Sequence, residues 1–499
     1  MTEHLIPIEQ AQENLLSCAT FLAENIKSSD GRGAAMKEIV PRFLEKGEVD
    51  MAAQLADVVD DPFVRDRLLS DVADKCAEID DDEYALQLVE SIEDLSLQSE
   101  AKERIAVRKA FIGEFDKAFE ITALLDHPSH ALGIIAYRQT VNNLETEAQQ
   151  TLARIEYPAA KVNALQLIAG HYEKENKIEQ ANNALDEAVK AAEETDLAEE
   201  TARILQYIAE HFRANGRNDK AIETFEKAKL IAEKVEGVHR DNLLAGVSIG
   251  QLRAGSVDLA DRTLDLVNDP AQTAACLVGF SRVFWKKGER EDALESLEEA
   301  YALVKSQRDR DIRDSRAHFA TLGTIAVQFA KCEKPERAIE IAQENISESE
   351  QTSALAQIAQ VCTQQSKDEF ARQAIAAIRD EVNRMSALIG VADAKKSLGA
   401  EEKAIEVLNE AAALCESIPQ LPARSSAYNE LAERFHEYEK TERAQELLHE
   451  SLETIADIRD ESTRAVTLAQ LASVYEQAGF TVSDAEKEIL KTMVRRAEW

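Results

Sequence analysis

The chain has 499 residues, and its 94 acidic and 58 basic side chains leave a formal net charge of −36. Glycine (17) and proline (9) are each below half their usual share, while 44% of the residues are hydrophobic and only 5% are aromatic. This composition excludes collagen-like, disulfide-knot and membrane-spanning classes, and it disfavours sheet-rich folds, which use glycine in turns and aromatic and β-branched residues in strands. The sequence therefore predicts a mostly helical chain.

The first predicted element is a lone helix over residues 8–27. Its tetrapeptide Ile-Glu-Gln-Ala at residues 8–11 recurs at residues 178–181, where it opens the second helix of a repeat. Residues 28–33, with the sequence SSDGRG, are typical of a linker. We therefore expect residues 1–33 to form a capping helix and a linker at the open end of a repeat array.

A repeated pattern occupies residues 34–499, which we predict to be one continuous array. Each copy contains an alanine, here called the anchor, with a large residue nine positions earlier and a small residue twelve positions earlier. The thirteen anchors are Ala52, Ala85, Ala118, Ala148, Ala181, Ala221, Ala260, Ala293, Ala338, Ala371, Ala404, Ala444 and Ala485. In the last copy the signature is shifted by one residue. Antiparallel helices that cross closely need small residues at the crossing and large ones beside it. Each copy therefore predicts a helix A, a tight turn and a helix B.

The turn and the length of helix B are also predicted from the pattern. Six glycines stand five residues before an anchor, where each can end helix A in a left-handed conformation: Gly47, Gly113, Gly216, Gly255, Gly288 and Gly399. The template Ala-x3-(Leu/Phe)-x2-(Ala/Ser) predicts a long helix B after the anchors at 181, 221, 293, 404 and 444, and shorter ones elsewhere. Between residues 306 and 316, alternating Arg and Asp predict an extended, exposed helix.

Two segments resemble the tetratricopeptide repeat (TPR). The first has I-A-x2-Y at 168–172 with A-x3-L-x2-A at 181–188, and the second has I-A-x2-F at 208–212 with A-x3-F-x2-A at 221–228. The resemblance covers roughly residues 30–499. It implies an all-α, right-handed superhelical solenoid of about 13 antiparallel helix pairs. No anchor spacing equals the 34 residues of the family, so an altered superhelical pitch is expected.

The resemblance also implies where a partner binds, because helix A lines the inner groove in this family. Its exposed groove positions lie 18, 15, 11, 8 and 7 residues before the anchor. In the seventh to ninth repeats these positions are apolar with a basic rim, and the predicted partner-binding residues are Ile249, Leu252, Arg253, Val278, Arg282, Trp285 and Val327. A second, weaker patch comprises Val107, Phe111, Tyr137 and Val141. The alternative is that a tight superhelix buries these residues against its own next turn.

No motif in the sequence indicates an active site. There is no Gly-rich phosphate loop, H-E-x-x-H helix or G-x-S-x-G elbow. His127 and His130 form the only close histidine pair, and they lack cysteine or carboxylate partners at metal-ligand spacing. Cys76 and Cys362 stand at the large-residue position of helix A, which indicates packing. We therefore expect no metal site, no cofactor and no enzymatic activity.

The charge and the cysteines bear on partners and compartment. A negative surface repels phosphate backbones and anionic membranes, so we expect neither a nucleic acid nor a membrane as partner. The six cysteines are widely spaced without a C-x-x-C pair, and the amino terminus lacks the basic and apolar regions of a secretion signal. The sequence therefore predicts a cytoplasmic protein, and it leaves the oligomeric state open.

The leading hypothesis is a non-enzymatic scaffold that binds a peptide or protein partner in its concave groove. Two alternatives remain. One is a regulatory receptor whose solenoid closes on a small peptide or metabolite. The other, less favoured, is a helical-toroid enzyme that would use His130, His171 or His211. RNA-reading helical repeats need basic grooves, which this chain lacks.

Overall fold

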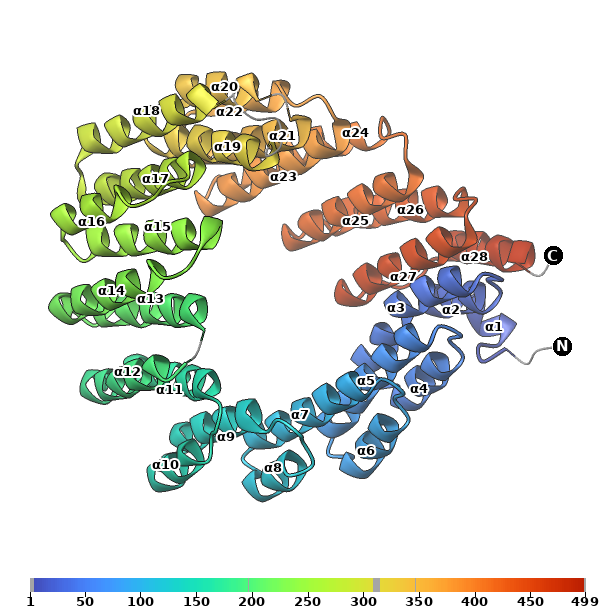
Figure 1. Ribbon diagram of the computed structural model, residues 1–499. Coiled ribbons are helices and arrows are strands. Elements are labelled where there is room, and N and C mark those ends of the chain that lie inside the picture. Colours follow the sequence, from blue (N-terminus) through green and yellow to red (C-terminus); the bar gives the residue numbers. More distant parts are fainter. Residues whose placement is uncertain (1–3, 196, 308–314, 346, 498–499) are drawn as a thin grey trace. The chain divides into compact units, whose positions relative to one another are not determined.

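The computed structural model describes residues 4–195, 197–307, 315–345 and 347–497. Most of the alternating Arg–Asp segment at 306–316 lies outside these residues. The described part is all-α, with 28 helices and no strand (Figure 1). None of the helices in it is both long and apolar enough to span a lipid bilayer. The predicted fold class is therefore confirmed.

The bounds of the helices are α1 Ile8–Ala11, α2 Leu15–Glu24, α3 Ser29–Glu45, α4 Val49–Asp57, α5 Pro62–Glu78, α6 Asp82–Glu90, α7 Leu95–Ile112, α8 Phe115–Thr122, α9 Ser129–Val141, α10 Glu145–Ala153, α11 Pro158–Lys174, α12 Ile178–Glu193, α13 Ala198–Ala214, α14 Asn218–Ala232, α15 Gly237–Arg253, α16 Val257–Leu264, α17 Pro270–Lys287, α18 Arg290–Gln307, α19 Ser315–Lys331, α20 Pro335–Glu344, α21 Glu348–Gln364, α22 Asp368–Ala376, α23 Glu381–Ser397, α24 Glu401–Cys415, α25 Leu421–Glu437, α26 Thr441–Ala456, α27 Glu461–Gln477 and α28 Asp484–Ala497. From α3 onwards, odd-numbered helices are helix A of a repeat and even-numbered helices are helix B.

Twelve of the thirteen anchors are buried, whereas Ala485 of α28 is exposed, so its prediction as a crossing residue is wrong. Ala169 of α11 and Ala181 of α12 are fully buried, and so are Ala209 of α13 and Ala221 of α14. The five helices predicted to be long, α12, α14, α18, α24 and α26, have 15 to 18 residues. The other helices B before α24 have 8 to 10. Apart from Ala485, both predictions are confirmed, because small residues permit close helix contact and a longer apolar stripe buries a longer helix.

The turn between helix A and helix B has the same backbone in every repeat. All six predicted glycines have positive φ. In the other repeats up to the twelfth, the equivalent residue also has positive φ although it is not glycine: Asp80, Asn143, Asn176, Glu333, Ser366 and Glu439. In the first repeat Glu48 N donates to Phe43 O at 2.9 Å and Gly47 N donates to Leu44 O at 3.0 Å, the two bonds of a Schellman motif. The conformation therefore follows from the repeat and not from glycine alone.

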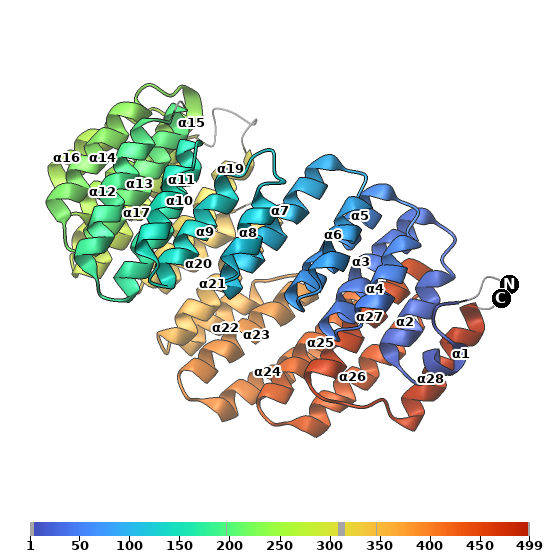
Figure 2. The same cartoon turned by 90° about the horizontal axis from the view of Figure 1, so that it is seen from below.

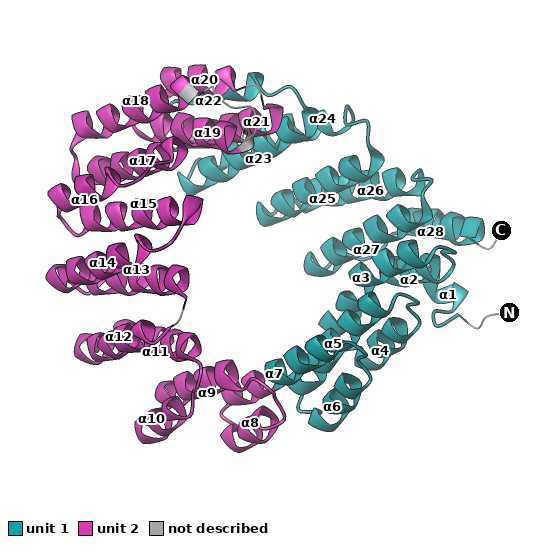
Figure 3. Ribbon diagram, viewed as in Figure 1, with its two compact units in different colours: residues 1–105, 366–499 teal, residues 106–365 magenta. Residues whose placement is uncertain are grey.

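The chain divides into two compact units, residues 1–105 with 366–499 and residues 106–365 (Figure 3). The boundaries fall within α7 and just after α21. The predicted division at residue 33 does not coincide with either boundary. The first unit contains the first and last repeats. The continuous array over residues 34–499 stays a prediction.

The N-terminal segment differs from its prediction. The helix expected over residues 8–27 is broken into α1 and α2, and residues 29–33 of the expected linker form the start of α3. Ser28 Oγ caps α3 by accepting a hydrogen bond from Gly31 N at 2.9 Å. A side chain on Gly31 would lie 3.3 Å from Ser462 Cβ of α27, so this glycine permits a close approach within a helix and does not mark a linker.

The two ends of the chain pack against each other within the first unit. Helix α2 lies on α27 and α3, and it also contacts α28 (Figures 1 and 2). Ser462 Oγ donates to Gly31 O at 2.9 Å, and ion pairs join Lys46 to Glu476 and Lys487 to Glu13. Residues 15–23 of α2 are all buried. Helix α2 therefore packs on α27 as a helix B does elsewhere, and it does not cap an open end.

Candidate functional site

The predicted groove of the seventh to ninth repeats lies on α15, α17 and α19, within the unit of residues 106–365. Leu252, Val278 and Val327 are buried, so their prediction as partner-binding residues is wrong. Ile249 is half-buried. Leu252 is buried in a core cluster with Cys276 and Phe280 of the adjacent helix A.

Glycines in helix A explain why the predicted groove residues are buried. Gly246 and Gly279 stand 14 residues before their anchors, and a Cβ on Gly279 would overlap Ile249 Cδ1 of the neighbouring helix A. The same position carries Leu167 in α11 and Tyr207 in α13, which are 41% and 53% exposed. Without a side chain at this position, α15 and α17 pack directly against each other. The side chains between α15 and α17 are therefore buried.

Arg253, Arg282 and Trp285 of the predicted site contact residues of their own or a neighbouring repeat. Arg253 forms an ion pair with Glu210 at 3.1 Å. Arg282 Nε donates to Gln328 Oε1 at 3.3 Å. The ring of half-buried Trp285 is covered by the Arg290 guanidinium, 3.5 Å from the ring centroid.

The weaker patch is partly accessible. Phe111 is exposed, whereas Val107, Tyr137 and Val141 are half-buried. The Arg138 guanidinium lies over the Phe111 ring, 4.7 Å from its centroid. Arg138 Nη2 also donates to Phe111 O at 2.8 Å. Phe111 is therefore shielded on one face.

Large apolar side chains are exposed between the end of one helix B and the first turn of the next helix A in four consecutive repeats. They are Leu124 (59% exposed), Tyr157 (53%), Leu197 (61%) and Val238 (57%), and we call them the apolar row. The first three stand 24 residues before their anchors, and Val238 stands 22 before its own. This recurrence is a sequence signal that the groove positions of the TPR family do not include. Isolated exposed apolar residues are common, but one recurring at the same place in successive repeats is not explained by packing.

Contacts between neighbouring repeats place these helix starts side by side. Tyr157 N donates to Ser129 Oγ at 3.3 Å, which joins the starts of α11 and α9. His239 Nδ1 lies 3.2 Å from Glu199 Oε1, which joins the starts of α15 and α13. Each member of the row has a carboxylate within two positions along the chain: Asp126, Glu156, Glu199 and Glu236. The row therefore combines apolar surface with negative charge.

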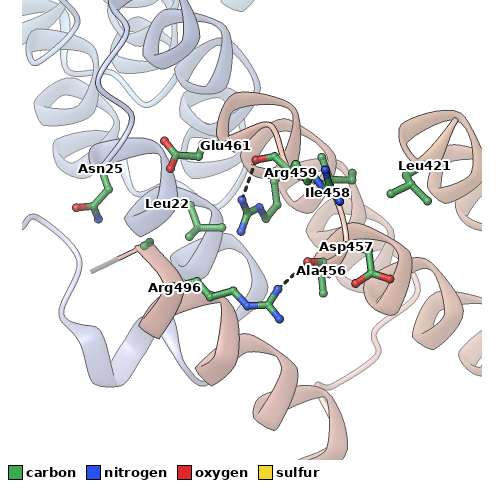
Figure 4. Close-up of a pocket in the computed structure, with 11 residues that line it drawn as sticks. Leu22, Asn25, Leu421, Ala456, Asp457, Ile458, Arg459, Glu461 and Arg496 are labelled. Atoms are coloured by element: carbon green, nitrogen blue, oxygen red, sulfur yellow. Dashed lines mark hydrogen bonds between the residues drawn. The ribbon is translucent and has the colours of Figure 1, made fainter. Parts of the chain in front are cut away.

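A pocket of about 610 Å³ lies in the first unit, where the chain ends meet (Figure 4). It is bounded by the C-terminal ends of α2, α26 and α28 and by the starts of α25 and α27. Arg459, Arg464 and Arg496 line it together with Leu22 and Asn25 of the N-terminal segment. Sequence reasoning could not find it, because its walls come from opposite ends of the chain.

One recurring arginine position adjoins this pocket. Twenty residues before their anchors, Arg32, Arg384 and Arg424 each donate through Nε and Nη2 to the carbonyl six residues earlier. The Nη2–O distances are 3.0, 2.7 and 2.6 Å. The spacing Ile-x5-Arg, present at 26–32, 378–384, 418–424 and 458–464, was a sequence signal for this contact.

Arg464, the fourth member of that series, bonds differently. Its Nη2 donates to Arg459 O at 3.3 Å, five residues earlier, while its Nε is buried without a hydrogen-bond partner. Buried guanidinium nitrogens are normally paired. Cys18 lies nearby in α2, and burial raises the pKa of its thiol to about 12 against the opposing influence of Arg464. The thiol is therefore neutral at pH 7.

The described residues offer little that could perform covalent chemistry. All six cysteines are buried, and burial raises the thiol pKa of Cys76 to about 11 and that of Cys276 to about 12. No group of three or more His, Cys, Asp or Glu within the described part of the chain could hold a metal ion.

Comparisons with known proteins concern the fold. No protein-family profile and no curated protein sequence matches the chain. Among solved structures it is similar to yeast Tom70, at 15% identity and a TM-score of 0.26 over 90% of this chain and 97% of that one. It is also similar to aspartyl phosphate phosphatase F from Bacillus subtilis, at 13% identity and a TM-score of 0.30 over 86% and 94%. The apo form of the quorum sensor NprR from B. thuringiensis is similar at 12% identity and a TM-score of 0.26, over 64% of this chain and 99% of that one.

The repeated pair of helices, with its small crossing residues and its common A–B turn, defines the class of protein. The described part of the chain is an all-α array of repeated antiparallel helix pairs.

Proposed function

We propose that this chain is a non-enzymatic scaffold that binds a protein or peptide partner, and that the apolar row is the binding surface. The single observation that supports the proposal is the exposure of Leu124, Tyr157, Leu197 and Val238, each by more than half, between the end of one helix B and the first turn of the next helix A in four consecutive repeats. Burying such side chains in an interface stabilises a complex by about 25 cal/mol per Å² of apolar area removed from water. We propose the apolar row as the binding surface instead of the groove predicted from the sequence.

The chemistry of the row indicates the chemistry of the partner. Its apolar residues are large, so they suit apolar side chains that recur along a partner segment. The carboxylates beside them, including Glu156 and Glu236, favour Lys and Arg on that segment. The partner proposed here is therefore a segment that carries both apolar and basic side chains.

A peptide-display experiment tests this function. A library of random peptides is selected on the full chain, and the selected peptides are measured by fluorescence anisotropy. We expect enrichment of apolar and basic residues, and at least tenfold weaker binding to the double variant Leu197→Ser, Val238→Ser. The reason is that the variant removes apolar contact area without touching the core.

The matched control is Leu230→Ser, since Leu230 is 57% exposed in the same unit but lies on helix B, away from the row. It should bind as the wild type does. Unchanged binding by the double variant, with its helicity confirmed by circular dichroism, would refute the row as the binding surface.

A further inference from the structure

We infer that the pocket between the two chain ends binds a small oxyanion, meaning a molecule with two or more carboxylate or phosphate groups. The inference is independent of the apolar row, which lies in the other unit. It rests on the hydrogen bonding of Arg464, on the lack of ion pairs at Arg459 and Arg496, and on the volume and lining of the pocket.

The first step is the unsatisfied guanidinium. Arg32, Arg384 and Arg424 use both Nε and Nη2 on a single carbonyl, which leaves these atoms no capacity for a ligand. Arg464 has turned away from the equivalent carbonyl, that of Ile458, and its Nε has no partner. Arg464 lines the pocket, and an oxyanion is an acceptor that a guanidinium binds strongly.

The second step concerns the two exposed arginines. Among the described residues, Arg459 forms no ion pair, and Arg496 donates only to Ala456 O at 3.3 Å. Three arginines therefore line one pocket without an ion pair among the described residues. Figure 4 shows Arg459, from the loop between α26 and α27, and Arg496, from α28, around the same pocket. They can therefore approach one ligand from two sides.

The third step is the environment of the arginines. Asp457 and Glu461 also line the pocket, but both are exposed and neither pairs with its arginines. Leu22 and Ile458 are buried apolar residues of the wall. A volume of about 610 Å³ falls within the range of small-molecule sites. The ligand class is therefore a compact polyanion with a small apolar portion, and a long chain would not fit.

The test is isothermal titration of the full chain with citrate and with inorganic pyrophosphate, in chloride buffer at constant ionic strength. We expect one probe molecule bound per chain. Binding of citrate alone would assign a carboxylate ligand, and binding of pyrophosphate alone would assign a phosphate ligand. Absence of binding by both probes would overturn the inference.

Variants identify the site. Arg459→Gln and Arg496→Gln should each weaken binding at least tenfold, and both side chains are exposed, so the fold should be retained. The matched control is Arg379→Gln, because Ile378-Arg379-Asp380-Glu381 repeats the tetrapeptide Ile458-Arg459-Asp460-Glu461 two repeats earlier, away from the pocket. Equal weakening by Arg379→Gln would show unspecific attraction to surface charge and overturn the assignment.

Discussion

At the scale of single residues, glycines inside helix A determine how closely neighbouring repeats approach. Gly250 of α15 faces the buried ring of Phe225, and a Cβ there would overlap the ring atoms Cε1 and Cζ. Gly170 of α11 has no atom of another residue within 4 Å of the position its Cβ would take. The two glycines have the same helical backbone and opposite surroundings.

Because of these surroundings, the same substitution to alanine should change the free energy of unfolding in opposite directions at the two sites. Gly250→Ala should lower the free energy of unfolding, because overpacking costs about 1–3 kcal/mol and exceeds the gain in helix propensity. Gly170→Ala should raise it by about 0.4–1 kcal/mol, because alanine restricts the unfolded chain. Urea denaturation followed by circular dichroism measures both. Stabilisation by Gly250→Ala would show that the Phe225 ring moves aside freely.

A buried carboxylate makes the last repeat sensitive to pH. Tyr475 Oη donates to Glu486 Oε1 at 2.6 Å and Ser483 N donates to Glu486 Oε2 at 2.7 Å. Burial acts to raise the pKa of Glu486, but these hydrogen bonds outweigh it and hold the pKa below its usual value. The folded state is therefore stabilised at pH values above the unfolded pKa, and this contribution is lost as the pH falls through the folded pKa.

Glu486→Gln should therefore destabilise the protein at pH 7, by roughly 1–3 kcal/mol. Its difference from the wild type should shrink as the pH falls below about 4, where the wild-type carboxylate also becomes protonated. Urea midpoints at pH 7, 5 and 3.5 measure the trend. Glu488→Gln, an exposed change in the same helix, is the control. If the stability difference between Glu486→Gln and the wild type were the same at all three pH values, ionisation of Glu486 would not contribute to stability.

At the scale of elements, the repeats show which features follow from local sequence. The lengths of the five long helices B and the position of every A–B turn were predicted, because an apolar stripe and a Schellman turn depend on residues within one repeat. The start of α3 was not predicted, because Gly31 and Gly33 are residues that usually indicate a linker. The close approach of Ser462, 431 residues away in the chain, explains why glycine stands there.

Helix α2 is the element that joins the chain ends, and Phe21 is its largest buried side chain, at 1% exposure. Phe21→Ala should cost about 3–5 kcal/mol of local stability. Because α2 packs on α27, amide hydrogen exchange in residues 461–477 should accelerate although they are distant in sequence. Phe63→Ala, at a site that is 64% exposed, should leave it unchanged. Faster exchange confined to α2 would show that α27 is stable without it.

At the scale of the whole molecule, the charge of −36 is spread over many surface positions, where carboxylates pair with bases one turn away or in the next repeat, as in Arg213–Glu210 and Lys227–Glu193. Exposed pairs of this kind contribute at most about 1 kcal/mol each. The net charge therefore says little about partners. The informative charges are the few that depart from this pattern, namely the arginines of the chain-end pocket.

The amino-acid sequence by itself determined the helical class, the repeat, the turns and the lengths of most helices, because each depends on periodicity within some 40 residues. Only the tertiary structure decided which faces are accessible. The groove residues Leu252 and Val278 became core because glycines let adjacent helices A meet. The chain-end pocket exists because α2 packs on α27, which brings Leu22 and Asn25 to the same pocket as Ile458 and Arg459. Contacts between distant segments decide both, and no local pattern records them.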